Sequence, residues 1–255
     1  MQPTPHLLLD ETMLRGATLA LIPGDPGRVP RMAKHLTEAC PLKSNRECLS
    51  YSGLVSGHPI IICSTGIGGP STAIAIEELA QCGVRTFIRV GTTGAIQPTI
   101  RVGDVIVTQA AVRLEGTSSH FAPLEFPAVA DHDVTSALIQ AAIASRATHH
   151  VGITVTSDTF YPGQERYDTF SGRVLPRFQG SIEQWRSLGA LNFEMEAATV
   201  LTMTRVFGLR AGCVLGVIAN RTQSEAIDGG AVETTEELAI RVAIGAASRL
   251  LAEQP

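Results

Sequence analysis

A short apolar segment that carries an arginine, residues 86–90, limits the possible folds of this chain more than any other feature. The apolar residues around Arg89 predict a strand that is buried on both faces of a sheet. A guanidinium in such a place costs free energy unless it meets an anion. We therefore expect Arg89 to bind an anionic ligand or to form an internal salt bridge.

A glycine-rich sequence, Gly91-Thr92-Thr93-Gly94, follows the predicted strand and indicates a turn. Glycines allow backbone N–H groups to approach a ligand, and the threonines add two hydroxyl groups. Together with Arg89, this sequence favours a phosphate or carboxylate site. The alternative is an internal ion pair followed by an ordinary turn.

A second arginine follows another predicted turn. Gly24 comes after the apolar segment 17–22, and Arg28 lies where a helix is expected to begin, near Val29. Helix N-termini and arginines both attract anions. Taken alone, these residues are compatible with a surface arginine beside a turn, but two arginine-bearing turns after two buried strands favour an anion site.

Composition favours one large α/β domain over residues 1–255, because 44% of the residues are hydrophobic and 17% are charged. The net charge of −4 provides no broad basic surface, so we expect neither nucleic acid nor a membrane as a partner. Residues 1–16 lack the basic start and apolar core of a signal peptide. Five scattered cysteines without a Cys-x-x-Cys pair predict reduced thiols in a cytoplasmic protein.

Predicted strands alternate with predicted helices, which is typical of a mixed, largely parallel sheet between helices. We expect strands at 17–22, 60–64, 86–90, 105–111, 152–156 and 211–218, and helices near 29–36, 71–82, 131–146, 194–207 and 233–252. Ligands of such sheets bind at the carboxyl ends of strands, where Gly24, Gly66 and Arg89 fall. The polar segment 162–188 has little periodicity, and we interpret it as an insertion or lid.

Two common nucleotide-binding motifs are missing from the sequence. The glycines of segment 65–71 match a dinucleotide fingerprint only in part, Pro70 interrupts the pattern, and no Walker sequence occurs. We therefore expect neither a Rossmann dehydrogenase nor a P-loop enzyme.

Two carboxylates, Glu194 and Glu196, lie at a predicted helix start. Residues two apart in a helical turn point to different faces, so we do not expect both to serve one ligand in the same way. Glu196 is suited to accept hydrogen bonds from two vicinal hydroxyls, and Glu194 to cap the helix. The alternative is the usual enrichment of acids in a first helical turn.

Three groups lie close together in the sequence: the aromatic ring of Phe160, the amide of Gln164 and the guanidinium of Arg166. An amide offers a donor and an acceptor, which match the imide edge of a pyrimidine, and an arginine can hold a carbonyl oxygen that gains charge. The alternative is a solvated loop. Asn220 and Arg221 follow the last predicted strand and offer further polar groups at the edge of the sheet.

Several of these motifs resemble the hexameric branch of the nucleoside phosphorylase family: Pro23-Gly24-Asp25-Pro26, the segments 63–71 and 157–167, Arg89-Val90-Gly91-Thr92-Thr93-Gly94 and Phe193-Glu194-Met195-Glu196. The resemblance extends from about His6 to the last helix, and Gln164 with Arg166 is typical of the pyrimidine members. Only segment 224–232 matches poorly. The resemblance implies a single domain whose central, mixed and partly barrel-like sheet is flanked by helices.

The resemblance also implies the residues of each subsite. Phosphate would be bound by Gly24, Arg28, Arg89 and Thr92, with Arg46 from a neighbouring subunit. Ribose and base would be bound by Thr93, Gly94, Phe160, Gln164, Arg166, Glu194, Met195, Glu196 and Arg221, with His6 from the neighbour. A monovalent cation such as potassium would lie at a dimer interface on Glu47, Ile67 and Ser71. The partner implied is a second copy of the chain, in a hexamer built as a trimer of dimers.

The expected reaction is the reversible phosphorolysis of uridine to uracil and ribose 1-phosphate in pyrimidine salvage, without a required cofactor. Arg28, Arg89, Gln164 and Arg166 would be the catalytic residues. A purine nucleoside phosphorylase, a nucleosidase and a non-catalytic nucleoside-binding protein are the alternatives. Asn220 argues against the first, because hexameric purine members use an aspartate in this region as an acid, and an asparagine cannot replace it.

Overall fold

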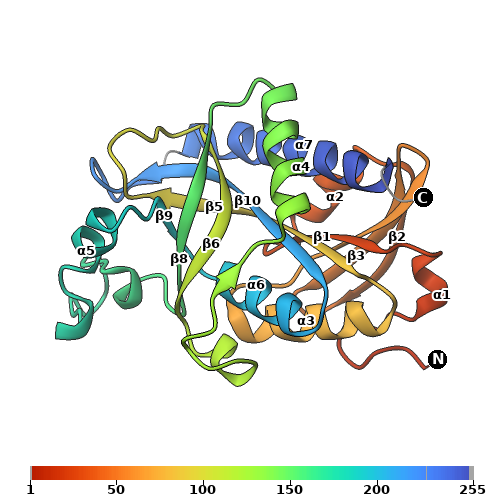
Figure 1. Cartoon of the computed structure of the whole chain (residues 1–255), viewed down its shortest axis with the longest axis horizontal. Helices are drawn as coiled ribbons and strands as arrows, with labels where there is room; N and C mark the ends of the chain where they lie inside the picture. The colour runs from red at the N-terminus through yellow and green to blue at the C-terminus, as the bar shows by residue number, and fades with distance from the viewer. Residues whose placement is uncertain (1, 228, 253–255) are drawn as a thin grey trace.

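The computed structural model describes residues 2–227 and 229–252, in which helices cover both faces of one mixed sheet (Figure 1). The strands are β1 (Leu19–Pro23), β2 (Thr37–Asn45), β3 (Cys48–Val55), β4 (His58–Cys63), β5 (Thr86–Ala95), β6 (Val105–Leu114), β7 (Ala128–Val129), β8 (His149–Ser157), β9 (Asn192–Glu194) and β10 (Arg210–Asn220). The α-helices are α1 (Glu11–Leu14), α2 (Arg28–Ala33), α3 (Gly69–Gln81), α4 (His132–Ala144), α5 (Ser181–Ser187), α6 (Ala197–Val206) and α7 (Gly229–Ala252). Short 3₁₀ helices are η1 (Thr117–His120), η2 (Pro162–Gln164) and η3 (Pro176–Phe178).

The sheet closes on itself at one end and remains open at the other. Its strand order is β10-β6-β8-β9-β5-β1-β4-β3-β2, and β10 also pairs with β5. A closed ring is therefore formed by β5, β10, β6, β8 and β9. The other strands of the path, β1, β4, β3 and β2, extend from β5 as an open sheet. This arrangement confirms the expected partly barrel-like α/β fold.

Alternate side chains of the central strands pack against opposite helical layers, as the two-residue period of a strand requires. In β1, Leu19 and Leu21 join the core that includes α2, α4 and α7 residues, whereas Ala20 and Ile22 join the core around α3 and α6. A smaller apolar cluster contains Val155 and Phe193, and Ile182 and Trp185 of α5 pack against it.

The six predicted strands and five predicted helices are all present, with shifted ends. The hairpin of β2 and β3 was not predicted, because most of β2 is exposed or half-buried and lacks a clear apolar pattern. The predicted helix near 194–207 begins only at Ala197, since β9 occupies Asn192–Glu194. His149 opens β8, and all five cysteines are free. Residues 1, 228 and 253–255 of the predicted domain, including residue 228 of segment 224–232, lie outside the described residues.

The turn predicted directly after Val90 is wrong, because β5 continues to Ala95 and stays paired with β10. Gly91 is needed for packing within this strand. A Cβ atom there would lie 2.8 Å from Leu215 Cδ2 and 2.9 Å from Nη2 of Arg89. The glycine therefore makes room for the guanidinium two residues before it.

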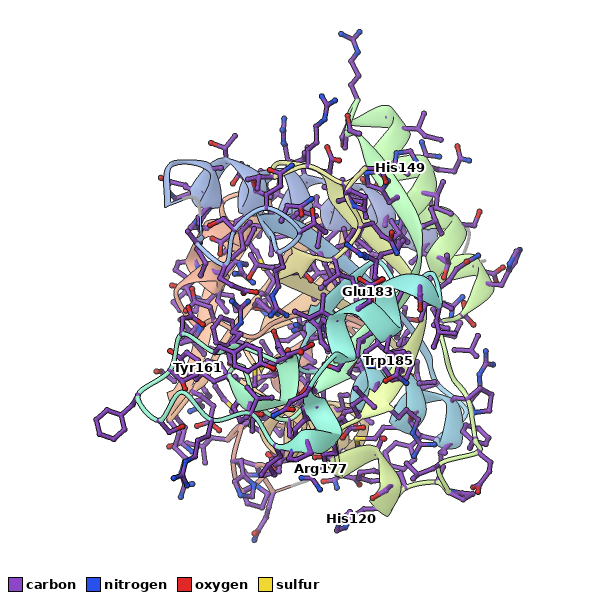
Figure 2. All side chains as sticks on the ribbon, turned by 90° about the vertical axis from the view of Figure 1, so that its left-hand side faces the viewer. His120, His149, Tyr161, Arg177, Glu183 and Trp185 are labelled. Carbon is purple, nitrogen blue, oxygen red and sulfur yellow. The ribbon has the colours of Figure 1, made fainter. Side chains whose placement is uncertain are left out.

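The segment 162–188 contains η2, η3 and α5, and it lies at the end of the molecule formed by the ring (Figure 1). Figure 2 views this end, with Glu183 and Trp185 of α5 facing the reader and Tyr161 at the edge. The sequence showed no helical pattern here because the elements are only three to seven residues long. Within the described residues, no helix is both long and apolar enough to cross a membrane.

Candidate active site

A cavity of about 660 Å³ lies at the carboxyl ends of β1 and β4, beside the part of β5 that continues beyond them. Of the residues expected to bind substrate, those that line it are Gly24, Arg28, Arg89, Thr92, Thr93, Gly94, Phe160, Gln164, Arg166, Glu194, Met195 and Glu196. Residues from distant parts of the chain thus meet at one place. The cavity is large enough for a small-molecule ligand.

A gap in strand pairing creates the floor of this cavity. On one side of β5, pairing with β1 ends at Val90, and pairing with β9 begins at Gly94. Residues 91–93 lie in the gap and line the cavity. The close approach of backbone that the sequence suggested is therefore made by an interrupted strand edge instead of a turn.

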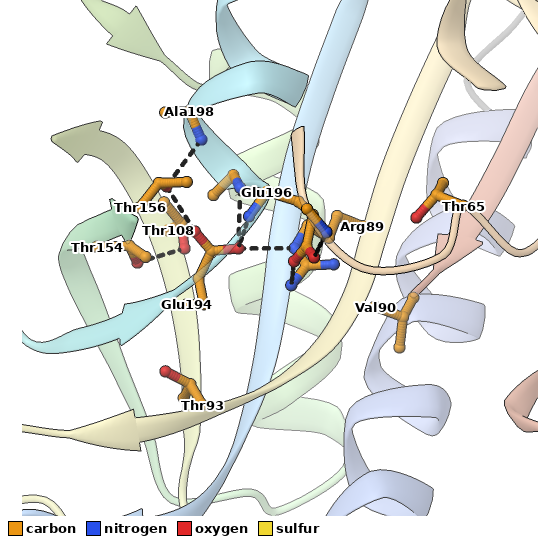
Figure 3. Close-up of polar contacts among 12 residues, drawn as sticks. Thr65, Arg89, Val90, Thr93, Thr108, Thr154, Thr156, Glu194, Glu196 and Ala198 are labelled. Carbon is orange, nitrogen blue, oxygen red and sulfur yellow. Dashed lines mark hydrogen bonds and ion pairs between the residues drawn. The ribbon is translucent and has the colours of Figure 1, made fainter. Parts of the chain in front are cut away.

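Arg89 lies at the centre of the site and pairs with two buried carboxylates (Figure 3). Its Nε lies 3.0 Å from Glu194 Oε2, and its Nη2 lies 2.5 Å from Glu196 Oε2. Burial alone would lower the pKa of Arg89, but the charges of Glu196 and Glu194 together raise it above its ordinary value. The internal ion pair that the sequence left as one alternative is present, and Arg89 also lines the cavity.

The two carboxylates do converge on one group, contrary to the expectation from helical spacing. Glu194 is in β9 and Glu196 precedes α6, so a helical turn does not separate them. Glu194 Oε2 also accepts hydrogen bonds from the backbone N–H groups of Glu196 and Ala197, at 2.7 and 2.9 Å. Glu194 therefore caps α6, as expected, and orients Arg89 as well.

Glu196 is the carboxylate best placed to accept hydrogen bonds from a ligand. Its Oε1 accepts a hydrogen bond from the N–H of Gly68, and it lines the cavity. Burial raises the pKa of Glu196, the negative charge of Glu194 adds to this rise, and Arg89 opposes it. A carboxylate in this environment gains from ligand hydroxyls that donate to it.

Arg28 forms the wall of the cavity nearest to α7. Its Nη1 donates to the carbonyl of Val90 at 2.9 Å, and its Nη2 pairs with Glu236 of α7. Glu236 also binds Arg31, at 2.5 Å. Nε of Arg28 is buried without a partner among the described residues, so this N–H remains for a ligand or water.

Thr93 lies between the two ends of the cavity. Its hydroxyl donates to the carbonyl of Phe193 at 2.6 Å and accepts a hydrogen bond from Nδ2 of Asn192 at 2.7 Å. These contacts join β5 to β9 and fix the side chain, which lines the cavity.

The opposite end of the cavity contains the residues expected to bind a base. Gln164 and Arg166 are 3% and 4% exposed, so the reading of this segment as a solvated loop is wrong for them. The guanidinium of Arg166 lies 4.1 Å above the ring of Phe160. Arg221 lies behind Gly94: a Cβ atom at Gly94 would be 3.1 Å from its Cδ.

His6, Arg46 and Arg221 are not among the described residues that line the cavity. Nδ1 of His6 lies 2.6 Å from Glu78 Oε1, and the carbonyl of His6 accepts a hydrogen bond from Asn45. Arg46 is exposed in the turn between β2 and β3, next to Asn45. These two residues therefore belong to one surface region outside the cavity of their own chain.

Glu47, Ile67 and Ser71 gather at the rim of the cavity. A Cβ atom at Gly66 would lie 2.6 Å from Cγ of Glu47 and 3.3 Å from Oγ of Ser71, so the loop and both side chains are close. The hydroxyl of Ser71 lies 3.2 Å from the carbonyl of Ile67. Oxygen atoms of this kind suit a hard cation.

Two carboxylates that hold arginines of the site, Glu225 and Glu236, were not predicted from the sequence. Glu236 lies on the apolar face of α7, three and four residues before the buried Ala239 and Ile240. An acid on a buried helix face needs a positively charged or hydrogen-bonding partner, so this position could have been recognised from the sequence. Glu225 lies in a segment with no periodicity, and four residues after Arg221 it resembles an ordinary surface charge.

Comparisons with known proteins identify the family of this chain. The model of the phosphorylase superfamily matches residues 18–252. The chain is 58% identical to the uridine phosphorylase of Escherichia coli K12 over 246 residues, which cover 96% of this chain and 97% of that protein. It is 58% identical to the uridine phosphorylase of Klebsiella aerogenes with the same coverage, and 57% identical to that of Haemophilus influenzae, over 96% and 98% of the two chains. The chain therefore belongs to the phosphorylase superfamily.

Proposed function

We infer that this chain catalyses the reversible phosphorolysis of uridine, which yields uracil and ribose 1-phosphate. The observation that carries this inference is the cavity with Arg28 and Arg89 at one end and Gln164 and Arg166 at the other. The relatives named uridine phosphorylase match nearly the whole chain, which supports the same activity.

At the phosphate end, the arginines neutralise the anion and direct it toward the anomeric carbon of the ribose. Cleavage of the glycosidic bond develops positive charge on the sugar, and the bound phosphate stabilises this charge as it attacks. Gly24, Thr92 and the open edge of β5 surround this position. Glu196 and Met195, with Thr93, line the middle of the cavity and are assigned to the ribose.

At the base end, Gln164 and Arg166 stabilise the departing uracil. Its carbonyl oxygens gain negative charge as the bond breaks, so hydrogen bonds donated to them strengthen in the transition state. Phe160 and Gly94 form the apolar wall of this part, and Arg221 lies behind Gly94 at the same end of the cavity.

A purine-specific reaction is not favoured. The amide of Asn220 donates to the carbonyls of Gln97 and Ile100, and its oxygen accepts from the N–H and hydroxyl of Thr222. The side chain is therefore committed to the backbone and has no acidic proton to give to a base. A nucleosidase, which uses water, has no use for the arginines around a phosphate.

We further propose that the active enzyme is a homo-oligomer, a hexamer built as a trimer of dimers. His6 and Arg46 are the supporting residues, because both lie outside the cavity of their own chain and are suited to reach that of a neighbour. Glu78 binds Nδ1 of His6, which leaves Nε2 available for the 5′-hydroxyl of a nucleoside.

A monovalent cation at the dimer interface is part of the same proposal. Glu47, the carbonyl of Ile67 and Ser71 supply oxygen ligands, one of them charged, and a second copy of the chain would double this set. The chemistry needs no redox cofactor, and we place the enzyme in the cytoplasm, in agreement with its five free cysteines.

The test is uridine cleavage with and without inorganic phosphate, with inosine as the control substrate. We expect uridine to be consumed only when phosphate is present and inosine to remain intact. Cleavage of inosine would assign the chain to purine chemistry, and cleavage without phosphate would make it a nucleosidase. Binding without turnover would contradict any enzymatic function.

A further inference from the structure

One carboxylate, Glu225, holds both arginines of the base end. Its two oxygens lie 3.1 and 2.8 Å from Nε of Arg221, and its Oε1 also accepts from Nη2 of Arg221 at 2.9 Å. Its Oε2 forms a salt bridge with Nη1 of Arg166. Glu225 thus joins two guanidinium groups that come from different connections, Arg166 between η2 and η3 and Arg221 directly after β10.

The two guanidinium groups are buried and close to each other. The side chains of Arg166 and Arg221 are 4% and 0% exposed. They meet at Gly94, where a Cβ atom would lie 3.1 Å from Cδ of Arg221 and 3.8 Å from Nη2 of Arg166. Two positive charges in this position repel each other unless an anion lies between them.

The charge balance at Arg166 depends on Glu225. Burial lowers the pKa of Arg166, the positive charge of Arg221 lowers it further, and Glu225 acts in the opposite direction. Cation–π contact with Phe160 holds one face of this guanidinium, and the carboxylate holds one edge. The two contacts together restrict Arg166 to one orientation.

The N–H groups that Glu225 does not occupy are left for a ligand. Nε of Arg166 and Nη1 of Arg221 are buried without partners in the part of the chain that the structure describes. Such groups are costly when nothing accepts their hydrogen bonds. A uracil carbonyl, directly or through a water, is the acceptor that the proposed reaction brings to this place.

We propose that Glu225 is a positioning residue of the base site, whose carboxylate orients Arg166 and Arg221 toward the uracil carbonyl that gains charge. This inference rests on the proposed function. Glu225 lies between β10 and α7, so recognition of the base depends on where this connection is placed. The phosphate end has its own carboxylates and does not depend on Glu225.

The first test is Glu225→Gln, which keeps the shape of the side chain and removes its charge. We expect kcat/KM for uridine to fall about ten- to hundredfold, because a charge-assisted contact to the arginines is lost, while the KM for phosphate changes less than about twofold. Glu225→Asp should retain part of the activity. The matched control is Glu237→Gln, since Glu237 is also partly exposed and forms one ion pair, with His35.

A second test separates positioning from general damage to the connection. In an Arg166→Ala/Arg221→Ala background, Glu225→Gln should cost less than about threefold, since both guanidinium groups that it orients are already gone. 5-Fluorouridine, whose uracil is a better leaving group, should suffer less from Glu225→Gln than uridine does.

Equal losses for uridine and phosphate, or a loss no larger than that of Glu237→Gln, would overturn the inference. A full-sized loss in the Arg166→Ala/Arg221→Ala background would do the same. Failure of the unmodified enzyme to cleave uridine would instead reject the proposed function, so the two failures are distinguishable.

Discussion

The two ends of the cavity, which we assign to phosphate and to the base, both hold arginines with carboxylates, but on different kinds of backbone. At the phosphate end, Arg89 is in a central strand, and its partners Glu194 and Glu196 have side chains that are 1% and 5% exposed. At the base end, Arg166 and Arg221 are in connections, and the side chain of Glu225 is 33% exposed. The comparison shows that one end is fixed by the sheet, whereas the other depends on loops held by a carboxylate.

The largest expected effect comes from Arg89→Ala at the phosphate end. We expect a loss of about a hundred- to a thousandfold in phosphate-dependent kcat. Glu194 and Glu196 would also lose their buried partner, so the free energy of unfolding should fall by about 3–5 kcal/mol. Steady-state kinetics and thermal denaturation measure the two effects.

The matched variant is Arg89→Lys, which keeps the charge but not the fork of N–H groups. It should unfold at a higher temperature than Arg89→Ala and still turn over slowly. Near-normal turnover of folded Arg89→Ala would remove this arginine from the site.

Gln164→Ala should affect the base end alone. We expect kcat/KM for uridine to fall about tenfold or more, because a hydrogen-bonding partner of the base is removed. The KM for phosphate should stay within about twofold, and Gln81→Ala, a change of an exposed residue of α3, is the control. A uniform loss for both substrates would mean that the segment 162–188 had collapsed, and would contradict the separation of the two ends.

Glu236→Gln should give a smaller effect, restricted to the phosphate end. Arg28 loses the charge that holds its Nη2, and Arg31 loses the same partner. We expect the KM for phosphate to rise about three- to tenfold with little change for uridine. Glu237→Gln is again the control, and an equal rise of the KM for uridine would argue against the assignment.

The smallest effect is a difference in backbone hydrogen exchange between the two ends. Amides of β1 and β5 should exchange slowly with or without ligands, because their hydrogen bonds lie in the middle of the sheet. Amides of segments 162–188 and 221–227 should exchange faster and slow down when uracil and phosphate are added. Equal exchange of these segments with and without ligands would count against a base end that orders around its substrate.

The two ends also differ in how far the sequence predicts them. At the phosphate end, the sequence indicates Arg89 because an arginine within a buried strand needs an anionic partner. It indicates Gly24 and Arg28 because they lie at a predicted turn and a predicted helix start. The carboxylates that pair with these arginines cannot be predicted from the sequence. Arg28 and Glu236, for example, are 208 residues apart, and no local pattern connects them. The interrupted pairing along β5 also depends on where β1 ends and β9 begins, which is a property of the whole sheet.

The base end has elements too short for a periodic pattern. The chemistry of Gln164 and Arg166 suggested a pyrimidine contact but left a solvated loop as the alternative, and the resemblance to a known family favoured the first. The resemblance assigned no role to Glu225, because this residue lies in segment 224–232, which matches the family poorly. Where aperiodic connections build a site, residue types indicate possible chemistry, but contacts such as Arg166 with Glu225 appear only in three dimensions.

Strand β5 also has a consequence for the order in which the enzyme fails on warming. It pairs with β1, β9 and β10, so it cannot leave the sheet without breaking both the ring and its extension. The connections that hold Arg166 and Glu225 lie outside the strands of this sheet. A gently heated sample should therefore first stop distinguishing nucleobases while it still retains phosphate, because selectivity depends on the parts that loosen early.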